Sequence, residues 1–332
     1  MKKIAIIGAF IFLTVFLTII GCFSDWKGGE GTLTITLGGD SNGRAVDWPP
    51  YADVPGKFRY PMKYILTLNG PTGTIEREFG FNENDLVENV IFTFFIAPGR
   101  WNVNVKAYVA DKGKFLYSTG DSNVNVRGGL DNSVGIKMNK AYYDIGDTGP
   151  GGGKIFHVNP RGFTLYLDKN DNVGIIAYYL EVAPEDCINP TDPSPSHKNF
   201  TWVSFGEADK YYPTLNAIGT GRKNTDLIIS YDNDLSDPAP AANACRNYRN
   251  GGKDDWFLPS IEEIAELLIN KQKVGFYNPE NSCWSSSQYP IINDSNEYVY
   301  CLYREDTNGS TTYKIGVTNK SVTLFVRPIR AF

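Results

Sequence analysis

Hydrophobic and polar residues alternate along much of the first half of the chain. Leu33, Ile35 and Leu37 occupy every second position of one run, and the run at 101–107 has the same period. A period of two predicts strands that bury one face. Further strands are expected at 63–68, 90–96, 115–119, 123–127 and 133–138. With about seven strands and turn signals between them, residues 32–138 are predicted to form an all-β sandwich.

The spacing of apolar residues becomes helical after a predicted hinge at residues 139–142. Ser260 and Glu263 form a capping-box sequence, and the apolar positions beside them share one helix face: Ile261, Ile264, Ala265 and Leu268. A second helix is expected at 238–248 and a shorter one after Asn224. Strands are expected at 283–288, 297–303, 311–317 and 323–330. Residues 143–332 are therefore predicted to form an α+β domain whose sheet lies mostly late in the sequence.

The first residues have the layout of a secretory signal. A short basic start is followed by an almost unbroken apolar run from residue 4 to residue 20. The run ends in Ile19-Ile20-Gly21-Cys22, which resembles the lipobox of bacterial lipoproteins. This resemblance implies a signal peptide at 1–21 and a lipid on Cys22 that would hold the protein on a membrane. The alternative is an uncleaved anchor helix, although the run lies at the low end of the roughly 17 to 25 residues that a span needs.

The segment at 22–31 is polar and rich in glycine, as a tether between lipid and fold should be. Phe23 and Ser24 follow the cysteine, and by resemblance to diderm lipoproteins this favours the outer membrane, with the protein exposed at the cell surface. The strand-rich segment at 32–138 resembles the small sandwich modules of spirochaete-type lipoproteins. It is interpreted as a stalk or spacer, with a binding module as the alternative.

The composition excludes several classes of protein. Apolar residues make up 42% and charged residues 21% of the 332 residues, which fits neither a disordered chain nor a multispanning membrane protein. With 37 acidic against 32 basic side chains the net charge is −5, so the chain offers no basic stripe for a phosphate backbone. Nucleic acid is therefore not expected as a partner.

The cysteines are consistent with export. Besides Cys22, the chain has Cys187, Cys245, Cys283 and Cys301, an even number within the second domain. An oxidising compartment then predicts two disulfides. The favoured pairs are Cys283 with Cys301, on neighbouring strands, and Cys187 with Cys245, between a loop and a helix. The alternative is four reduced, buried thiols.

The sequence carries no motif of a known catalytic site. The glycine run at 146–153 precedes Lys154 like a phosphate-binding loop, but Thr148 and Ile155 stand where that motif needs a glycine and a hydroxyl residue. The run is interpreted as a flexible turn. With only His157 and His197 in the chain, zinc catalysis has no set of ligands.

A pair of catalytic carboxylates is harder to exclude. The acid and base of a glycosidase can lie anywhere in a sequence, so a carbohydrate hydrolase stays open as an alternative. Three glutamates lie off the apolar stripe of the best helix and are expected to form a solvated face: Glu262, Glu263 and Glu266.

Six phrases of the second domain occur in the order expected of one bacterial domain family. They lie at 145–156, 180–186, 218–225, 255–260, 284–287 and 326–332. Together, from Ile145-Gly146-Asp147-Thr148-Gly149 to Val326-Arg327-Pro328-Ile329-Arg330, they resemble the Lcl C-terminal domain family, named for the C-terminal domain of a collagen-like surface adhesin. The resemblance covers about residues 143–332 and implies a C-type-lectin-like fold. Members of this family share no catalytic set, so the resemblance implies a scaffold more than an activity.

Four residues within these phrases are candidates for a structural role. Trp256 and Trp284 are interpreted as core residues that each bury on the order of 200 Å² of side-chain surface. Arg327 and Arg330 are expected to form structural ion pairs, with capture of a ligand as the alternative.

Calcium binding has weak support. The Glu-Pro-Asn, Gln-Pro-Asp and Trp-Asn-Asp patterns of calcium-dependent C-type lectins do not occur in the sequence. An oxygen-rich cluster at Asn293, Asp294, Asn296 and Glu297 could hold a hard cation, but a polar surface turn is favoured. No cofactor is therefore predicted.

The segment at 288–321 is rich in Tyr, Asn, Ser, Thr and Asp, a composition that resembles an antibody-like binding surface. The predicted contact residues are Tyr289, Asn293, Asp294, Asn296, Tyr298, Tyr303 and Arg304. The leading hypothesis is a lipid-anchored surface protein whose lectin-like domain binds a glycan or a surface protein without catalysis. The alternatives are an extracytoplasmic carbohydrate hydrolase and a purely structural envelope protein.

Overall fold

The computed structural model describes residues 29–38, 51–54, 58–80, 91–109, 115–189, 198–204, 206–232, 238–275, 282–290, 295–307 and 310–332. The chain divides into two compact units, Met1–Tyr142 and Tyr143–Phe332. The expected signal peptide and Cys22 lie outside the described residues, as do Asn293 and Asp294. Within the described ranges, no helix combines the length and the apolar character that crossing a membrane requires.

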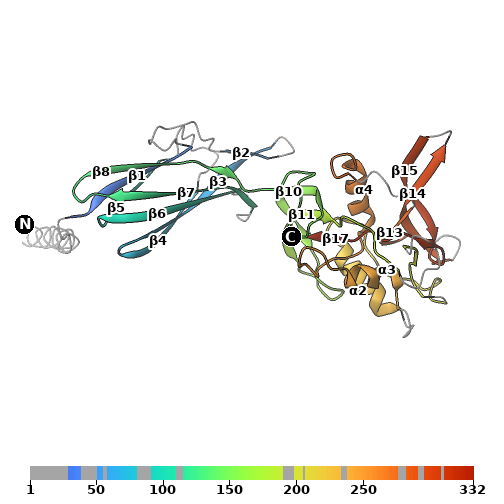
Figure 1. Ribbon diagram of the computed structural model, residues 1–332. Coiled ribbons are helices and arrows are strands. Elements are labelled where there is room, and N and C mark those ends of the chain that lie inside the picture. The colour runs from blue at the N-terminus through green and yellow to red at the C-terminus, as the bar shows by residue number, and fades with distance from the viewer. Residues whose placement is uncertain are drawn as a thin grey trace, which may run out of the picture. The chain divides into compact units, whose positions relative to one another are not determined.

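The first unit contains two β-sheets (Figure 1). One sheet has the order β5-β1-β8, with bounds Ile91–Ile96, Gly31–Leu37 and Asp131–Ile136. The other has the order β2-β3-β6-β7-β9, and β4 also pairs with β3. Its bounds are Tyr51–Val54, Phe58–Gly70, Gly99–Val109, Phe115–Val126 and Asn139–Lys140, with β4 at Gly73–Gly80. The described part of this unit is thus all β, as the alternating pattern predicts.

The alternation in sequence becomes the core of the first unit. Leu33, Ile35 and Leu37 are almost completely buried, while the residues between them are partly exposed. Tyr64 on β3 meets Phe92 on β5 edge to face, with ring centroids 5.8 Å apart. Because β3 and β5 belong to different sheets, this contact joins the buried faces of both sheets in one apolar core.

Several details of the first unit differ from the sequence prediction. Residues 139 and 140 of the predicted hinge form strand β9, which pairs with β7. The strands expected at 115–119 and 123–127 are one strand, β7, which runs through Gly120. At Gly120 a side chain would collide with Ile136 and the carbonyl of Lys137, so this glycine serves a close approach instead of a turn. The exposed strand β4 carries too few apolar residues to be recognised from its pattern.

The second unit combines three small sheets with three described helices. The sheets have the orders β10-β11-β17, β12-β16 and β13-β14-β15. In the first sheet, β10, β11 and β17 span Lys154–Leu165, Ile175–Val182 and Ile329–Ala331. In the second, β12 and β16 span Phe200–Thr201 and Thr323–Leu324. In the third, β13, β14 and β15 span Cys283–Gln288, Tyr298–Thr307 and Ser310–Asn319. The helices α2, α3 and α4 span Gly221–Tyr231, Pro240–Asn247 and Ile261–Ile269. The described part of this unit is therefore α+β.

The strands predicted at 283–288, 297–303 and 311–317 are present as β13, β14 and β15, but two long strands at the start of the unit were not predicted. Strands β10 and β11, from the start of the unit, pair with each other, and the last strand β17 joins β11. The strand expected at 323–330 is also divided into β16 and β17, with Pro328 between them. Proline lacks the N–H group that a strand donates, which explains the break. Helix α2 begins at Gly221, before Asn224, and with 11 residues it is not short.

Helix α4 starts with the predicted capping box. The Ser260 hydroxyl accepts a hydrogen bond from the Glu263 amide, and the Glu263 carboxylate accepts one from the Ser260 amide at 2.7 Å. The helix buries Ile261, Ile264 and Leu267 against the apolar core that includes the β10-β11-β17 sheet. The apolar spacing and the cap thus both specify where this helix begins and which side it buries.

Candidate functional site

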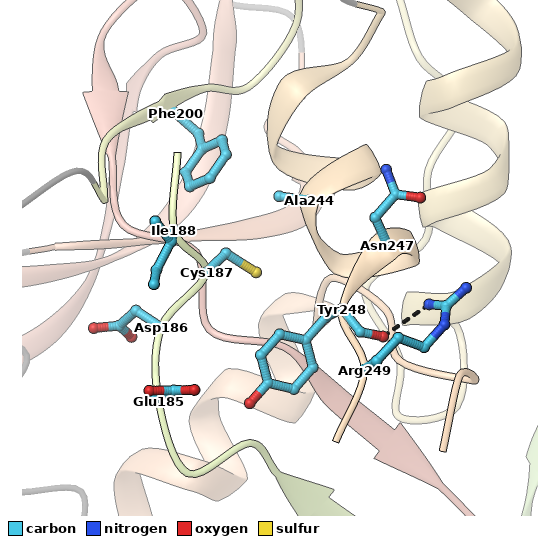
Figure 2. Close-up of a pocket in the computed structure, with 9 residues that line it drawn as sticks. All are labelled: Glu185, Asp186, Cys187, Ile188, Phe200, Ala244, Asn247, Tyr248 and Arg249. Carbon is cyan, nitrogen blue, oxygen red and sulfur yellow. Dashed lines mark hydrogen bonds between the residues drawn. The ribbon is translucent and has the colours of Figure 1, made fainter. Parts of the chain in front are cut away.

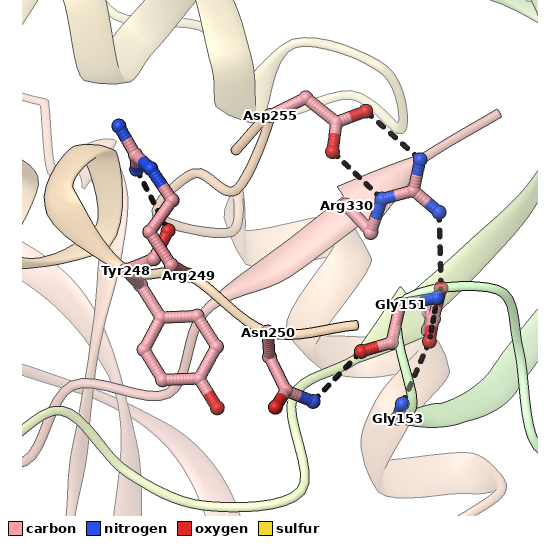
Figure 3. Close-up of polar contacts among 8 residues, drawn as sticks. Gly151, Gly153, Tyr248, Arg249, Asn250, Asp255 and Arg330 are labelled. Atoms are coloured by element: carbon pink, nitrogen blue, oxygen red, sulfur yellow. Dashed lines mark hydrogen bonds and ion pairs between the residues drawn. The ribbon is translucent and has the colours of Figure 1, made fainter. Parts of the chain in front are cut away.

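A buried ion network connects the start and the end of the second unit (Figure 3). The carboxylate of Glu181 on β11 is completely buried and accepts hydrogen bonds from the amides of Gly151 and Gly153, the latter at 2.7 Å. Arg330 on β17 donates to the same carboxylate at 3.1 Å and to both oxygens of Asp255 at 2.8 and 2.9 Å. The glycine run is therefore not a flexible turn, because its amides bind a carboxylate of its own chain.

The electrostatics of this network are those of a structural site. Burial pushes the pKa of Asp255 upward, but the hydrogen bonds and the charge of Arg330 more than offset this and lower it. Burial likewise opposes the charge of Arg330, yet Asp255 and Glu181 raise its pKa. Arg330 and Asp255 therefore stay ionised together. Arg330 forms a structural ion pair and has no free face for a ligand.

The other family-like phrases are joined by hydrogen bonds in the same way. The side chain of Asn224 donates to Ser286 at 3.1 Å, and the amide of Leu258 donates to the Thr225 hydroxyl at 3.0 Å. Trp256 and Trp284 are fully buried, and the indole of Trp284 donates to the carbonyl of Phe200 at 2.7 Å. Residues from all six phrases thus belong to one framework.

Glu263 corrects the prediction of a solvated acidic face. Its side chain is completely buried, and its carboxylate accepts hydrogen bonds from the amides of Gly219, at 2.8 Å, and Ser260. Burial raises the pKa of Glu263 to about 7, against the lowering effect of the surrounding amides. Glu266 is half-buried and contacts His157 at 3.2 Å, which lowers the pKa of Glu266. Only Glu262 of the three is exposed.

A pocket of about 360 Å³ opens between the loop after β11 and the end of α3 (Figure 2). It is lined by Glu185, Asp186, Cys187, Ile188, Phe200, Ala244, Asn247, Tyr248 and Arg249. The loop is held in place from behind, because the amides of Ala183 and Cys187 donate to the carbonyls of Pro328 and Val326, both at 2.9 Å. The framework phrases thus support one wall of this pocket, and α3 supplies the other.

The pocket combines an apolar wall with polar groups. Phe200, Ile188 and Ala244 supply the apolar part, and Asn247 and Arg249 are exposed at the helix end. Tyr248 extends from the end of α3 toward the loop that carries Glu185 (Figure 2). Its hydroxyl oxygen is buried and has no hydrogen-bond partner in the described part of the chain. A buried hydroxyl without a partner costs roughly 1–3 kcal/mol, so this group is a hydrogen-bonding position that the protein itself leaves unfilled.

The pKa of Tyr248 keeps the hydroxyl protonated. Burial raises it to about 12, and the negative charge of Glu185 contributes in the same direction. A phenol that stays protonated can donate one hydrogen bond and accept others. A ligand group that reached this buried oxygen would pair with it by donating or accepting a hydrogen bond, as a hydroxyl does.

The two carboxylates of the pocket have different roles. Asp186 is buried and bound by Arg327 at 2.5 Å, and Lys198 lies 3.6 Å away. Arg327 is therefore a structural residue like Arg330. Glu185 is exposed, and no ion pair or hydrogen bond engages its side chain within the described residues. Glu185 is thus the acidic group that remains available to a ligand.

The cysteines differ from the predicted pair of disulfides. The structure contains no disulfide in its described part, and all four cysteines of the second unit are buried thiols. Cys283 lies opposite Leu302 and Cys301 lies opposite Trp284, so the two thiols point to opposite faces of the sheet. They accordingly belong to two different apolar cores, and this predicted disulfide is wrong.

Cys187 and Cys245 are in contact. Burial raises the pKa of Cys245 well above its ordinary value, and a hydrogen bond with Cys187 adds to this effect. The loop residue and the helix residue are thus neighbours, as their expected pairing requires. Their contact joins the two walls of the pocket.

The predicted contact residues do not form one surface. Tyr298 and Tyr303 lie five positions apart on a strand with unbroken register, so their side chains point to opposite faces of β14. Tyr289 lies against Tyr300, with ring centroids 4.9 Å apart, on the face that also carries Tyr298 and Arg304. Tyr303 is 45% exposed on the other face. Asn296 lies before the strand, where its amide donates to Asp209 at 3.3 Å.

Sequence reasoning missed this pocket because its walls come from residues about sixty positions apart. The expected pairing of Cys187 with Cys245 was the one signal that brought the two stretches together.

Scans against family models and searches of curated proteins and of solved structures found no match.

Proposed function

We propose that the protein is a lipid-anchored binding protein of the cell envelope, tethered through Cys22 and exposed at the surface. Its second unit is a C-type-lectin-like domain related to the Lcl C-terminal family, and it binds a hydroxyl-rich ligand of the glycan class without converting it. The pocket beside Tyr248 and Glu185 is the binding site. The first unit acts as a spacer between the lipid and this domain.

The hydrogen-bonded framework supports the family proposal. Four of the six phrases meet in the buried network around Glu181, Arg330 and Asp255. Hydrogen bonds from Leu258 to Thr225 and from Asn224 to Ser286 connect the other two phrases to them. Convergence of this kind is expected when a set of motifs specifies a scaffold. It gives no support to a catalytic set, because the charged groups of the phrases are mostly engaged with one another.

The unpartnered hydroxyl of Tyr248 is the observation that carries the ligand class. A sugar ring offers hydroxyls that can pair with this phenol and with Glu185, and apolar C–H groups that can pack on Phe200 and Ile188. The volume of about 360 Å³ lies in the usual range of small-ligand pockets. A protein partner would instead need a flat area of about 800 Å² on each side.

A glycan array probed with the purified full chain tests the proposal. Glu185→Gln should weaken binding to the glycans that the wild type retains, because it removes an unpaired acceptor charge at the pocket rim. Asp254→Asn is the matched control, since Asp254 is an exposed carboxylate of the same unit that does not line the pocket. The proposal fails if the wild type retains no glycan, or if both variants bind equally well.

A further inference from the structure

Strand β15 (Ser310–Asn319) lies at the edge of its sheet. The sheet order is β13-β14-β15, and β14 is the one strand that pairs with β15 in the described part of the chain. The pairing is unbroken over ten residue pairs, from Tyr298 opposite Asn319 to Thr307 opposite Ser310. Every second residue of an edge strand directs its N–H and C=O groups away from the sheet, so β15 presents a long row of backbone groups to another strand.

The chain protects another edge strand with charge, but not this one. Strand β4 carries Glu76, Arg77 and Glu78, which are exposed and discourage pairing with a further strand. Strand β15 has a single charged residue, Lys314, and its ammonium group binds Glu305 of the same hairpin at 2.8 Å. It also contains neither a proline nor a bulge. Of the usual obstacles to strand addition, β15 therefore has only this one lysine, whose charge is paired within its own hairpin.

Apolar side chains extend to this edge. Ile315 and Val317 are 41% and 40% exposed, and they lie opposite Leu302 and Tyr300 on the same face of the hairpin. Tyr313 shares this face and packs against the core of the unit. The apolar stripe thus starts in the core and ends uncovered at the outer strand.

We propose that a second copy of this chain adds its own β15 to this edge, antiparallel and centred on Ile315. In this register Ile315 faces Ile315 of the second copy, and Tyr313 faces Val317 of the second copy, an aromatic residue against a β-branched one. Lys314 faces Gly316 of the second copy, so no like charges lie opposite each other. The two three-stranded sheets then form one sheet of six strands, and the interface has the twofold symmetry of a closed dimer.

The interface is independent of the proposed binding site, because none of the residues that line the pocket belongs to β14 or β15. Sedimentation equilibrium of the purified protein tests it. Ile315→Lys places two like charges opposite each other at the centre and should weaken the dimer at least tenfold. Val322→Lys is the matched control, because Val322 is also 40% exposed but lies beyond the strand. It should leave the dimer unchanged.

Hydrogen exchange separates this proposal from its alternatives. The amides of Tyr313, Ile315 and Val317 should become protected as the wild-type protein is concentrated, while those of Ile315→Lys should not. A wild type that stays monomeric at its highest soluble concentration overturns the proposal. So does a dimer that survives Ile315→Lys, because another surface then forms it. If only an added extended peptide protects β15, the edge binds a different partner and the second copy is excluded.

Discussion

Arg330 and Asp255 form a two-point ion pair in which Nε and Nη2 of the guanidinium lie 2.8 and 2.9 Å from the two carboxylate oxygens. The third nitrogen of the same guanidinium binds the buried carboxylate of Glu181. One side chain of the last strand therefore neutralises acidic groups from two distant segments. Without it, the amides of Gly151 and Gly153 would be the remaining described partners of Glu181.

Removing the guanidinium should destabilise the second unit strongly. Arg330→Met leaves Glu181 buried without a counter-charge, and breaking a buried pair in this way costs about 3–5 kcal/mol. Urea denaturation followed by tryptophan fluorescence measures the loss. Lys63→Met is the comparison, because it breaks an exposed ion pair with Glu78 and should cost the first unit less than about 1 kcal/mol. Equal, small effects of the two substitutions would contradict the structural role of Arg330.

Glu263 should make stability depend on pH. Its pKa is about 7 in the folded protein against an ordinary value of 4.5 for a glutamate, so the folded state binds the proton more tightly. Between pH 4.5 and 7 the folded state then holds more protons than the unfolded state, and stability falls as the pH rises. The effect amounts to a few kcal/mol, since each pH unit corresponds to about 1.4 kcal/mol.

Glu263→Gln isolates this effect because the glutamine keeps the shape but cannot titrate. The difference in unfolding free energy between the wild type and this variant, measured by urea denaturation at several pH values, should change through this range. The unfolding free energy of the wild type should decrease relative to that of Glu263→Gln as the pH increases. A difference that is constant from pH 4.5 to 7 would show that Glu263 titrates normally.

Under oxidising conditions the second unit should form one disulfide, not two. Cys187 and Cys245 are in contact, while the thiols of Cys283 and Cys301 point to opposite sides of the sheet. Oxidised glutathione should exchange with the first pair, which forms one cystine and releases two molecules of reduced glutathione. Alkylation under denaturing conditions, followed by peptide mapping, identifies the thiols that remain.

Cys187→Ser is the control for this measurement, and it should leave Cys245 reduced or in a mixed disulfide with glutathione. Cys283→Ser should not affect the bond between Cys187 and Cys245. Recovery of all four thiols from the oxidised wild type would contradict the expectation. A peptide that joins Cys283 to Cys301 would do so as well.

The sequence predicted those elements whose causes are local. The alternation at Leu33, Ile35 and Leu37 specifies a strand, and the capping box at Ser260 specifies a helix start, without help from distant residues. The burial of Glu263 could not be predicted, since it depends on the amide of Gly219, forty-four positions away. The spacing of apolar residues around the helix does not reveal a contact over such a distance in the sequence.

The candidate site shows the same division. Apart from the expected pairing of Cys187 with Cys245, nothing near Tyr248 in the sequence indicates that Glu185 shares its pocket, because the two residues meet only after the loop and α3 fold together. The placement of Tyr298 and Tyr303 on opposite faces, by contrast, could have been predicted from the sequence. Strand alternation alone places residues five positions apart on opposite sides, so the sequence already contained that correction.

The dissociation constant of Tyr248→Phe for the best-retained glycan, relative to the wild type, tests the central claim most directly. The substitution removes one hydroxyl and keeps the ring, so the free protein should be at least as stable, because the unpaired group is gone. Binding should nevertheless weaken about tenfold, the effect of one lost hydrogen bond of roughly 1.4 kcal/mol. Tyr211→Phe, at a tyrosine that is 53% exposed outside the pocket, should bind like the wild type. Wild-type affinity in Tyr248→Phe would contradict the assignment of this pocket as the binding site.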